Sequence, residues 1–474
     1  MALANPDYRA LLGSTLEHAL SFLNQMDTAP VGAAKTASEL RKALAKALPE
    51  TGMRSEQVIE ELFHDTRGGI HGSASGRFFA WVVGGALPSA LAADWLTSTW
   101  NQNAALYCGS PAAAIVEEVV GDWLKQLLQI PPHASFALVT GSQMAHATCM
   151  AAARNALLSR LGWDVEEQGL FGAPRIRILV SGKQHGSIER AVRLLGFGKG
   201  SMVAVATDPL GRIRVEELHQ VLRSGPAAPT ILCLQAGDIN TGAFDDFAAI
   251  LPLAKLYPAW IHVDGAFGLW AAASPHYRHL LAGAEQADSW VTDGHKWLNV
   301  PYDCGYAFIA DPVAHQAAMT LHAAYLTHAS DARDQMNFTP EWSRRGRGFP
   351  TYAALRQLGR EGVVKLIDGC CEHARALVKG IGELPGVEVV SEPIINQGLV
   401  RFVSPAGDEA AHDRRTDEVI ASVNATGEAY FSGTTWQGRR AMRVSVCNWR
   451  TSDEDVERAV KSVASVLESS LQIR

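Results

Sequence analysis

Three segments place reactive or charged side chains at the ends of short apolar runs. In the first, Asp293-Gly-His-Lys-Trp297, Lys296 lies between a histidine and a tryptophan soon after an apolar strand. A partly desolvated amine in such a place is suited to forming a Schiff base with a carbonyl compound. A lysine that simply extends from a loop into water is the common alternative. The two other segments favour the chemical role.

The segment Ile261-His-Val-Asp-Gly-Ala-Phe267 ends an expected strand with Asp264. An acid here either caps a turn or pairs with a protonated heterocycle nitrogen, whose pKa it raises. His262 and Asp264 also have metal-binding side chains, but no third ligand has a useful spacing, so we expect no metal. In the third segment, Ser181-Gly-Lys-Gln-His-Gly-Ser187, His185 is either a capping residue or a ring that stacks on a planar ligand.

Two glycine-containing turns are candidates for binding phosphate. Gly141-Ser-Gln143 joins an expected strand to a helix, where backbone N–H groups favour an anion, although many such turns bind nothing. The run Gly196-Phe-Gly-Lys-Gly-Ser201 has a glycine after its lysine, where a phosphate-binding P-loop requires serine or threonine. We therefore exclude a P-loop.

Short apolar runs alternate with helical segments through the middle of the chain. This alternation predicts a mostly parallel sheet that helices cover on both faces. Ligands of such sheets bind outside the carboxyl ends of the strands, where we expect His185, Asp264 and Lys296 to converge. The expected strands span residues 136–140, 175–180, 202–206, 231–235, 260–264, 289–292 and 306–309.

The length of 474 residues suggests more than one domain, and we expect three parts. Residues 1–76 form an N-terminal helical segment, with helical periodicity from residue 8 to about 48, that packs on the partner subunit because it is too small to bury its own core. Residues 77–350 form a large domain. Residues 351–474 form a smaller α+β domain. Its expected elements are helices at 351–358, 363–380 and 453–467 and strands at 387–390, 397–403 and 442–446.

Composition excludes several classes of protein. The net charge of -7 and the lack of a basic run argue against a nucleic-acid partner. No apolar run approaches the roughly twenty residues needed to span a bilayer, and the first residues lack the pattern of a signal peptide. The seven cysteines show no paired metal-type spacing, so we expect a reduced, cytoplasmic protein.

The order of these segments resembles the group II pyridoxal-phosphate-dependent amino-acid decarboxylases, which include the aromatic-amino-acid and glutamate decarboxylases. Besides the Gly-Ser turn and His185, the resemblance rests on Asn240-Thr-Gly-Ala-Phe-Asp245, His262-Val-Asp-Gly-Ala266 and Asp293-Gly-His-Lys-Trp297. It extends over nearly the whole chain. It implies an aspartate-aminotransferase-like type I fold with a mostly parallel seven-stranded sheet, pyridoxal 5'-phosphate as cofactor, and a homodimer with shared active sites.

The resemblance also implies a role for each matching residue. Lys296 would carry the cofactor as a Schiff base, Asp264 would pair with the pyridine nitrogen, and His185 would stack on the ring. Ala266 would pack against the opposite ring face, and Asn240 would lie near the ring substituents. The implied phosphate contacts are Ser142, Gln143 and His295.

The implied reaction is decarboxylation of an L-amino acid, which displaces Lys296 to form an external aldimine and leaves as the amine after losing carbon dioxide. Much of the family assists protonation with a loop tyrosine, and an ungapped match places Gln335 at that position. This sequence has no tyrosine between Tyr325 and Tyr352. Such a loss is associated with relatives that consume oxygen and release an aldehyde.

Other outcomes remain open at this point. His322 or His328 could supply the proton in place of a tyrosine. An oxygen-dependent aldehyde synthase and an aminotransferase are alternatives that use the same cofactor. A non-catalytic scaffold is a further alternative, which the complete set of cofactor residues opposes.

The expected substrate pocket is aromatic and apolar. Trp81, Val82 and Tyr107 lie where the family builds its side-chain pocket, partly from the neighbouring subunit, and they favour a neutral or aromatic amino acid; residues of these types are equally common in a core. Asp293 stands where many relatives have asparagine. Because a carboxylate near the phosphate would be repulsive, we expect Asp293 to face a backbone amide.

Overall fold

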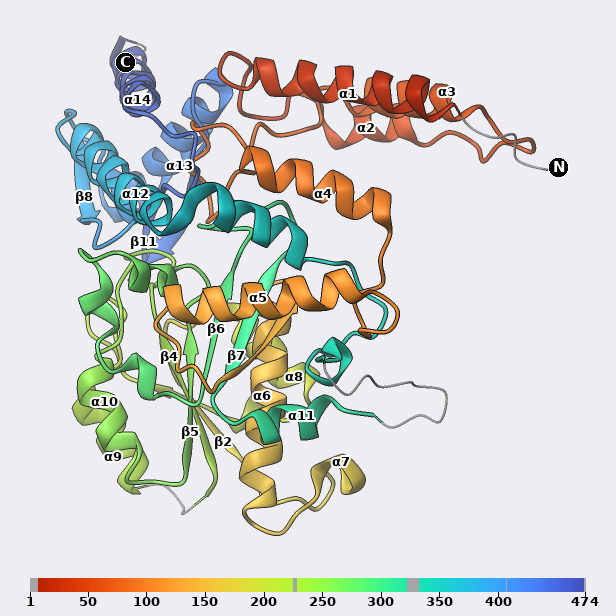
Figure 1. Cartoon of the computed structure of the whole chain (residues 1–474). Coiled ribbons are helices and arrows are strands. Elements are labelled where there is room, and N and C mark those ends of the chain that lie inside the picture. Colours follow the sequence, from red (N-terminus) through yellow and green to blue (C-terminus); the bar gives the residue numbers. More distant parts are fainter. Residues whose placement is uncertain (1–6, 225–227, 322–331, 406, 473–474) are drawn as a thin grey trace.

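A seven-stranded sheet occupies the middle of the molecule (Figure 1). The computed structural model describes residues 7–224, 228–321, 332–405 and 407–472. The strands lie side by side in the order β1 (Ser135–Val139), β7 (Gly305–Ile309), β6 (Ser289–Asp293), β5 (Ala259–Asp264), β4 (Thr230–Gln235), β2 (Arg177–Ser181) and β3 (Met202–Val205). Neighbouring strands from β6 to β3 are parallel, and β7 runs antiparallel to both β6 and β1. The expected mostly parallel seven-stranded sheet is confirmed.

Both faces of this sheet are buried, and consecutive residues of a strand point to opposite faces. Leu138 and Leu232 belong to the apolar core on one face, whereas Val139 and Ile231 belong to the core on the other. Strands of this kind have continuous apolar runs, which is why the sequence indicated their positions. Shortening Leu232 to alanine is expected to cost about 3 kcal/mol of stability.

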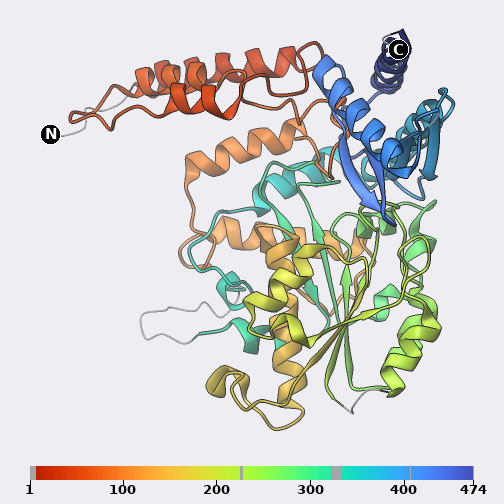
Figure 2. The ribbon, with the colours of Figure 1, turned by 180° about the vertical axis from the view of Figure 1, so that it is seen from behind.

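Helices cover each face of the sheet. The face of Val139 packs on α6 (Ser142–Ser159), α8 (Gly186–Leu194) and α11 (Pro312–Met319), and α6 and α8 lie on the near side in Figure 2. The face of Leu138 packs on α5 (Pro111–Leu127), α9 (Val215–Ser224) and α10 (Phe247–Ala254). The large sheet and its helices therefore form three layers.

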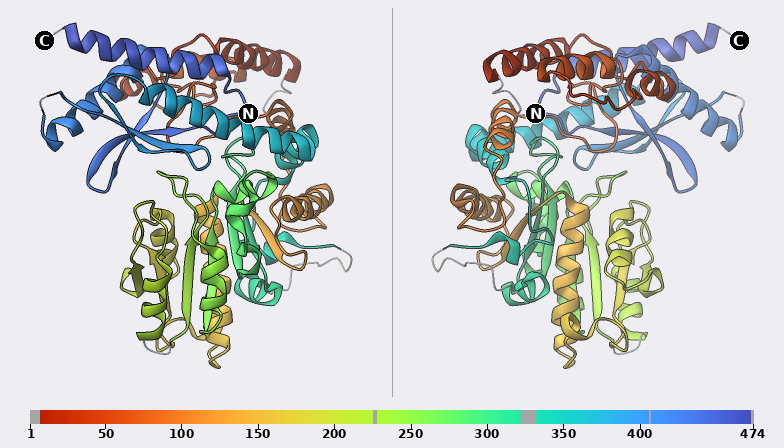
Figure 3. Two further views of the ribbon diagram at one scale, coloured as in Figure 1. Left: turned by 90° about the vertical axis from the view of Figure 1, so that its left-hand side faces the viewer. Right: turned by 90° about the vertical axis from the view of Figure 1, so that its right-hand side faces the viewer.

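A four-stranded antiparallel sheet lies beyond one end of the large sheet (Figure 3). Its order is β10 (Ser432–Trp436), β11 (Arg439–Ser445), β9 (Gln397–Phe402) and β8 (Val387–Ser391). The helices around it are α12 (Gly348–Gly382), α13 (Glu409–Thr426) and α14 (Asp453–Gln472). The expected small α+β part is confirmed. The sequence did not indicate β10, because its residues Ser-Gly-Thr-Thr-Trp are mostly polar and only partly buried.

Helix α12 connects the two sheets, since it contacts α5 at one end and β9 at the other. Gly359 interrupts it with φ 60° and ψ -176°, a conformation that favours glycine. The two helices expected at 351–358 and 363–380 are therefore the two halves of one kinked element.

The N-terminal residues form α1 (Tyr8–Gln25), α2 (Ala37–Leu44) and α3 (Ser55–Thr66), which extend along the top of the molecule in Figure 1. The prediction of one continuous helical pattern from residue 8 to about 48 was wrong. Pro30 lies in the non-helical segment that separates α1 from α2. Thr36 and Glu39 begin α2 with a reciprocal capping box. None of the residues in α1, α2 or α3 is buried.

The remaining helical segments are α4 (Pro88–Trp100), α7 (Val165–Gln168), η1 (Lys199–Ser201), η2 (Gly268–Ala273), η3 (Arg278–Leu281), η4 (Ala284–Gln286) and η5 (Gln335–Asn337). Across the described residues, no helix is both long and apolar enough to cross a membrane.

Candidate active site

A cavity of about 550 Å³ opens at the carboxyl ends of the parallel strands. A parallel sheet brings the residues that follow its strands to one edge, so segments that are distant in sequence meet there. Asn240 does not line this cavity. The cofactor-site residues expected from the sequence that do line it are Ser142, Gln143, His185, Asp264, Ala266, His295 and Lys296.

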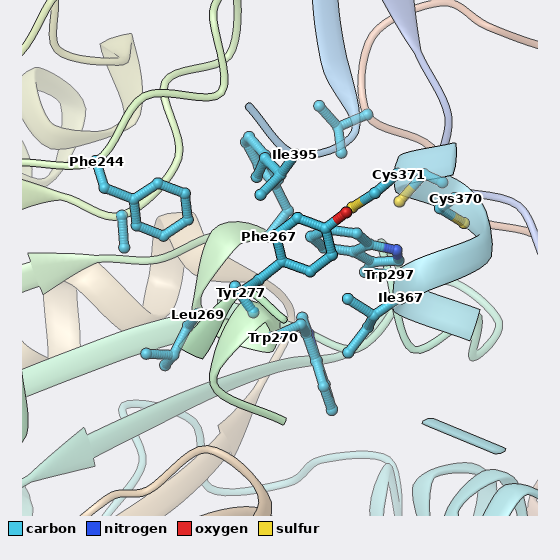
Figure 4. Packing of buried hydrophobic residues seen from close by; sticks show 14 of the residues in the cluster. Phe244, Phe267, Leu269, Trp270, Tyr277, Trp297, Ile367, Cys370, Cys371 and Ile395 are labelled. Atoms are coloured by element: carbon cyan, nitrogen blue, oxygen red, sulfur yellow. The ribbon is translucent and has the colours of Figure 1, made fainter. Parts of the chain in front are cut away.

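Lys296 lies three residues beyond the end of β6, and its Nζ atom is 3.2 Å from Oδ2 of Asp293. The next residue, Trp297, is buried in the apolar core beside Phe267, with 6.4 Å between the ring centroids. Figure 4 shows this indole between Phe267 and Cys370 of α12. Because the indole is fixed in the core, the backbone holds the Lys296 amine at the cavity.

The carboxylate of Asp293 is buried, and its Oδ1 atom accepts the backbone N–H of Ser142 at 2.6 Å. This contact confirms the expectation that Asp293 faces a backbone amide. The amide belongs to the first turn of α6, where the helix dipole favours negative charge. One N–H group expected for a phosphate is therefore bound to a carboxylate of the chain itself.

Gly84 packs directly on the loop that carries Lys296. A Cβ atom on Gly84 would lie 1.9 Å from the backbone oxygen of Lys296. The N–H of the next residue, Gly85, donates to Oδ1 of Asn299 at 2.6 Å. The sequence analysis assigned no role to this glycine pair, whose signal is two glycines within an apolar stretch.

Asp264 ends β5 and is almost buried. Its Oδ1 atom accepts the N–H of Ala266 at 3.2 Å, and its Oδ2 atom lies 3.6 Å from Nε2 of His146 on α6. Burial lowers the pKa of His146 to about 3, so this imidazole is neutral. Within the described residues, no lysine or arginine forms an ion pair with Asp264. The carboxylate is therefore available to a cation inside the cavity.

His185 caps a helix and also lines the cavity, so the cap leaves its ring free to meet a ligand, and stacking on that ligand stays a prediction. Its Nδ1 atom accepts the N–H of Ser187 at 3.3 Å and lies 2.8 Å from the Ser187 Oγ atom, at the start of α8. The ring borders solvent through the cavity, yet the surrounding chain desolvates it and lowers its pKa, which the charge of Asp264 opposes. A neutral imidazole in this place suits stacking on a planar ring.

His295 presents a defined ring nitrogen. Its Nδ1 atom accepts the N–H of Cys304 at 3.0 Å, so a neutral ring carries its proton on Nε2. Burial lowers the pKa of His295, which favours this neutral form. The ring also stacks on Tyr302, with 4.4 Å between the centroids. His295 is therefore suited to donate an N–H to an anion.

The sequence matches the family model of the pyridoxal-dependent decarboxylase conserved domain over residues 38–404. The chain belongs to this decarboxylase family. Tryptophan decarboxylase 1 of Oryza sativa subsp. japonica is 28% identical to it over 473 residues, which cover 93% of this chain and 90% of that protein. Phenylacetaldehyde synthase of Arabidopsis thaliana is 24% identical over 439 residues, which cover 89% and 88%. The crystal structure of Oryza sativa TDC with PLP and tryptamine has a TM-score of 0.92 and 23% identity, over 99% of both chains, and shows the same fold.

The cavity of this pyridoxal-dependent decarboxylase fits pyridoxal phosphate. At the start of α6, the Oγ atom of Ser142 and the Nε2 atom of Gln143 are buried and have no hydrogen-bond partner in the described residues. These two donors suit a phosphate at a helix N-terminus. Lys296 supplies an amine for the aldehyde, and Asp264 supplies a carboxylate for the ring nitrogen.

Three of the expected site residues lie away from the cavity of the decarboxylase chain. The Oδ1 atom of Asn240 accepts the hydroxyl of Thr434 on β10 at 3.0 Å, so this side chain joins the large part to the small sheet. Val82 lies in the apolar core. Trp81 packs against Tyr430, with 6.2 Å between the ring centroids, and is 49% exposed. Neither Val82 nor Trp81 lines the cavity within one chain.

The other two expected pocket residues lie together near the start of α5, outside the cavity. The N–H of Tyr107 donates to Asp334 at 2.9 Å. The buried side chain of Gln335 donates to the backbone oxygen of Ala114 at 3.3 Å. Their role in a substrate pocket stays a prediction for an assembly of two chains. His322, Tyr325 and His328 lie outside the described residues.

Arg443 of β11 carries a charge near His185 that the sequence analysis missed. Its Nη2 atom donates to the backbone oxygen of Trp81 at 3.3 Å, and its Nε atom has no partner among the described residues. Burial lowers the pKa of Arg443 to about 10, opposed by the charge of Asp238. Arg443 in turn contributes to lowering the pKa of His185. An arginine within the strand expected at 442–446 was the available signal.

Proposed function

We propose that the chain decarboxylates an L-amino acid with a neutral or aromatic side chain, on pyridoxal phosphate held by Lys296, Asp264 and His185. The observation that carries this proposal is one cavity in which an amine, a buried carboxylate and a neutral imidazole meet. When bound, pyridoxal phosphate takes up the electron pair left by departing carbon dioxide.

The residues of the chain have distinct tasks in this proposal. Asp264 holds a proton on the ring nitrogen, because an opposite charge nearby favours the protonated form. His185 and Ala266 keep the ring plane fixed from its two faces. The phosphate contacts are Ser142, Gln143 and His295. Asn240 would reach the ring substituents only after its side chain leaves Thr434.

Replacing Lys296 by alanine tests the assignment of the amine. We expect Lys296→Ala to lose the visible absorbance of bound cofactor while near-ultraviolet circular dichroism shows an unchanged fold. The matched control is Lys199→Ala, a lysine on the surface that pairs with Glu189 at 3.0 Å. Unchanged colour in Lys296→Ala would remove Lys296 from this role.

The preference for a neutral or aromatic substrate has two supports. Trp81 is half-exposed beside Phe78 and Tyr430, and its backbone oxygen accepts a hydrogen bond from Arg443, whose charge acts on His185. A relative is named as a tryptophan decarboxylase. A panel of L-amino acids, assayed for carbon dioxide release, is expected to show higher kcat/KM for tryptophan, tyrosine or phenylalanine than for glutamate. A higher value for glutamate would contradict the preference.

An aldehyde-forming reaction is the alternative, and the lack of a tyrosine between Tyr325 and Tyr352 favours it. A relative is named as a phenylacetaldehyde synthase. In that reaction the amino acid, one dioxygen and one water give the aldehyde, carbon dioxide, ammonia and hydrogen peroxide. Assaying amine, ammonia and peroxide together separates the outcomes. Amine without peroxide supports decarboxylation alone, and equal amounts of peroxide and ammonia support the aldehyde synthase.

We also propose that the protein works as a homodimer, with residues 1–76 packed on the partner subunit. Leu12, Leu16 and Leu20 lie four residues apart on α1 and are exposed, so they form one apolar stripe. Light scattering is expected to give twice the mass of 51.0 kDa. Leu16→Glu with Leu20→Glu is expected to yield monomers, whereas a wild-type monomer would refute the proposal.

We also propose that the protein is cytoplasmic. Six of the seven cysteines have free, buried thiols. Small buried thiols without disulfides fit a reducing compartment. Cell fractionation with an antibody to the native chain would test the location, and recovery from an oxidising compartment would contradict it.

A further inference from the structure

A row of buried polar side chains runs beneath the cavity and ends at Asp264. Trp260, His262 and Asp264 occupy alternate positions of β5, so their side chains share the face of the sheet that packs on α6. His146 of α6 and Ser289 of β6 complete the row. Trp260, His262, Ser289 and His146 are all essentially inaccessible to water.

Short contacts link the members of this row in order. The Trp260 Nε1–H donates to the Oγ atom of Ser289 at 2.9 Å. That oxygen lies 2.8 Å from Nδ1 of His262. The Nε2 atom of His262 lies 2.9 Å from Nδ1 of His146, whose own Nε2 atom lies 3.6 Å from Oδ2 of Asp264. The row therefore leads from the apolar core to the carboxylate.

The carboxylate at the end of the row sets the direction of the protons. A serine oxygen can accept two hydrogen bonds, so the Trp260 Nε1–H alone does not fix where the Ser289 hydroxyl points. A carboxylate oxygen accepts, so the arrangement that suits Asp264 places the proton of His146 on Nε2. Nδ1 of His146 then accepts from Nε2 of His262, whose Nδ1 accepts the Ser289 hydroxyl. Burial lowers the pKa of both imidazoles to about 3, so each holds one proton, as this arrangement requires.

The Nε2 atom of His146 has no hydrogen-bond partner in the described residues, and at 3.6 Å its contact with Asp264 is longer than a hydrogen bond. The N–H dipole nevertheless points at an almost buried carboxylate, where a low local dielectric strengthens the interaction. Lys296 and Asp293 also act on His146, but their opposite charges change its pKa in opposite directions.

We propose that His146 is a positioning residue, oriented by His262 and Ser289, whose Nε2–H keeps the carboxylate of Asp264 aimed at the ring nitrogen of pyridoxal phosphate. This inference rests on the proposed function, because it assumes that Asp264 meets that nitrogen. His262, Ser289 and Trp260 form a hydrogen-bonded row that orients His146 on the side of Asp264 away from the cavity. None of these four residues lines the cavity.

Neutron diffraction from crystals of the deuterated full chain tests the direction of the protons, with or without cofactor. We expect deuterium on Nε2 and not on Nδ1 of both His146 and His262, and a Ser289 hydroxyl that points at His262. Deuterium on Nδ1 of His146, or on both of its nitrogens, would overturn the inference. This result does not depend on the identity of the cofactor.

Titration with pyridoxal phosphate, followed by absorbance, tests the consequence for Asp264. We expect His146→Leu to bind about fivefold more weakly, the size expected of one N–H directed at a buried charge, and Ser289→Ala to change affinity in the same direction. His146→Gln, which retains a side-chain N–H, is expected to recover most of the affinity. The pH dependence of the visible band of bound cofactor is expected to shift in His146→Leu and to match that of the wild type in His146→Gln.

The matched control is His315→Gln on α11. His315 is equally buried, its Nδ1 atom lies 2.8 Å from the Ser135 Oγ atom and its Nε2 atom 2.8 Å from the backbone oxygen of Phe338, and it does not adjoin Asp264. We expect wild-type affinity in this control. An equal loss in His315→Gln, or wild-type affinity in His146→Leu, would overturn the inference and leave the proposed function intact. Failure of the wild-type chain to bind pyridoxal phosphate would instead refute the proposed function.

Discussion

The Oδ2 atom of Asp293 lies 3.2 Å from the Nζ atom of Lys296, and the other oxygen of Asp293 accepts the backbone N–H of Ser142 at 2.6 Å. One buried carboxylate thus joins the reactive amine to the start of α6, where a phosphate is expected to bind. It holds the Lys296 side chain at the cavity, but it also places a negative charge next to the phosphate site. These two effects oppose each other when the cofactor binds.

Asp293→Asn separates the two effects. The amide oxygen can still accept the N–H of Ser142, whereas the negative charge is lost. We expect pyridoxal phosphate to bind about fivefold more tightly, because two like charges at short range are relieved of repulsion. Pyridoxal without the phosphate is the control ligand, and its affinity is not expected to rise. An equal gain for both ligands would show that the change acts through Lys296 instead.

Gly84→Ala is expected to displace the loop that carries Lys296. The added Cβ atom would lie 1.9 Å from the Lys296 backbone oxygen, so either segment must shift. We expect at least about a tenfold loss of cofactor affinity, since a displacement of about 1 Å in a site is known to be costly. Gly369→Ala is the control, because a Cβ atom there meets nothing within 4 Å. Wild-type affinity in Gly84→Ala would show that the loop tolerates the shift.

Arg443→Met is expected to raise the pKa of His185. The positive charge of Arg443 lowers the pKa of that imidazole, together with desolvation and Lys296, so removing the charge acts in the opposite direction. The measurement is a pH titration of His185 by NMR in the chain without added cofactor. Arg439→Met changes an arginine of the same strand that pairs with Glu388 at 2.9 Å, and it is expected to leave His185 unchanged. A fall in the pKa of His185 in Arg443→Met would contradict this effect of the Arg443 charge.

The sequence predicted the large sheet well because its strands are buried on both faces. The run expected at 231–235 is β4 at Thr230–Gln235, since every residue of that strand is apolar or buried. The break after α1 was missed because leucines continue at helical spacing on both sides of the turn. Strand β10 was missed because one of its faces is exposed and its side chains are polar.

The site shows a similar division. Lys296, Asp264 and His185 could be brought together from the sequence because each follows or ends a strand, and parallel strands share one edge. The contact between His146 and Asp264 could not, because it depends on how α6 packs on β5. The effect of Arg443 on His185 was also missed, since Arg443 belongs to the second sheet.

Buried neutral histidines predict how stability depends on pH, and His315 gives the clearest test. Burial lowers its pKa from 6.5 to about 3, so below pH 6.5 the unfolded chain binds a proton that the folded chain does not. Acid therefore favours unfolding, and His315 reduces the free energy of unfolding by about 1.4 kcal/mol per pH unit as the pH falls from 6.5 toward 3. His315→Gln retains a donor for the backbone oxygen of Phe338 and is expected to remove this contribution from the slope. Urea unfolding between pH 7 and 5 measures it, with the exposed His279→Gln as control, and an unchanged slope in His315→Gln would show that His315 is protonated in the folded chain.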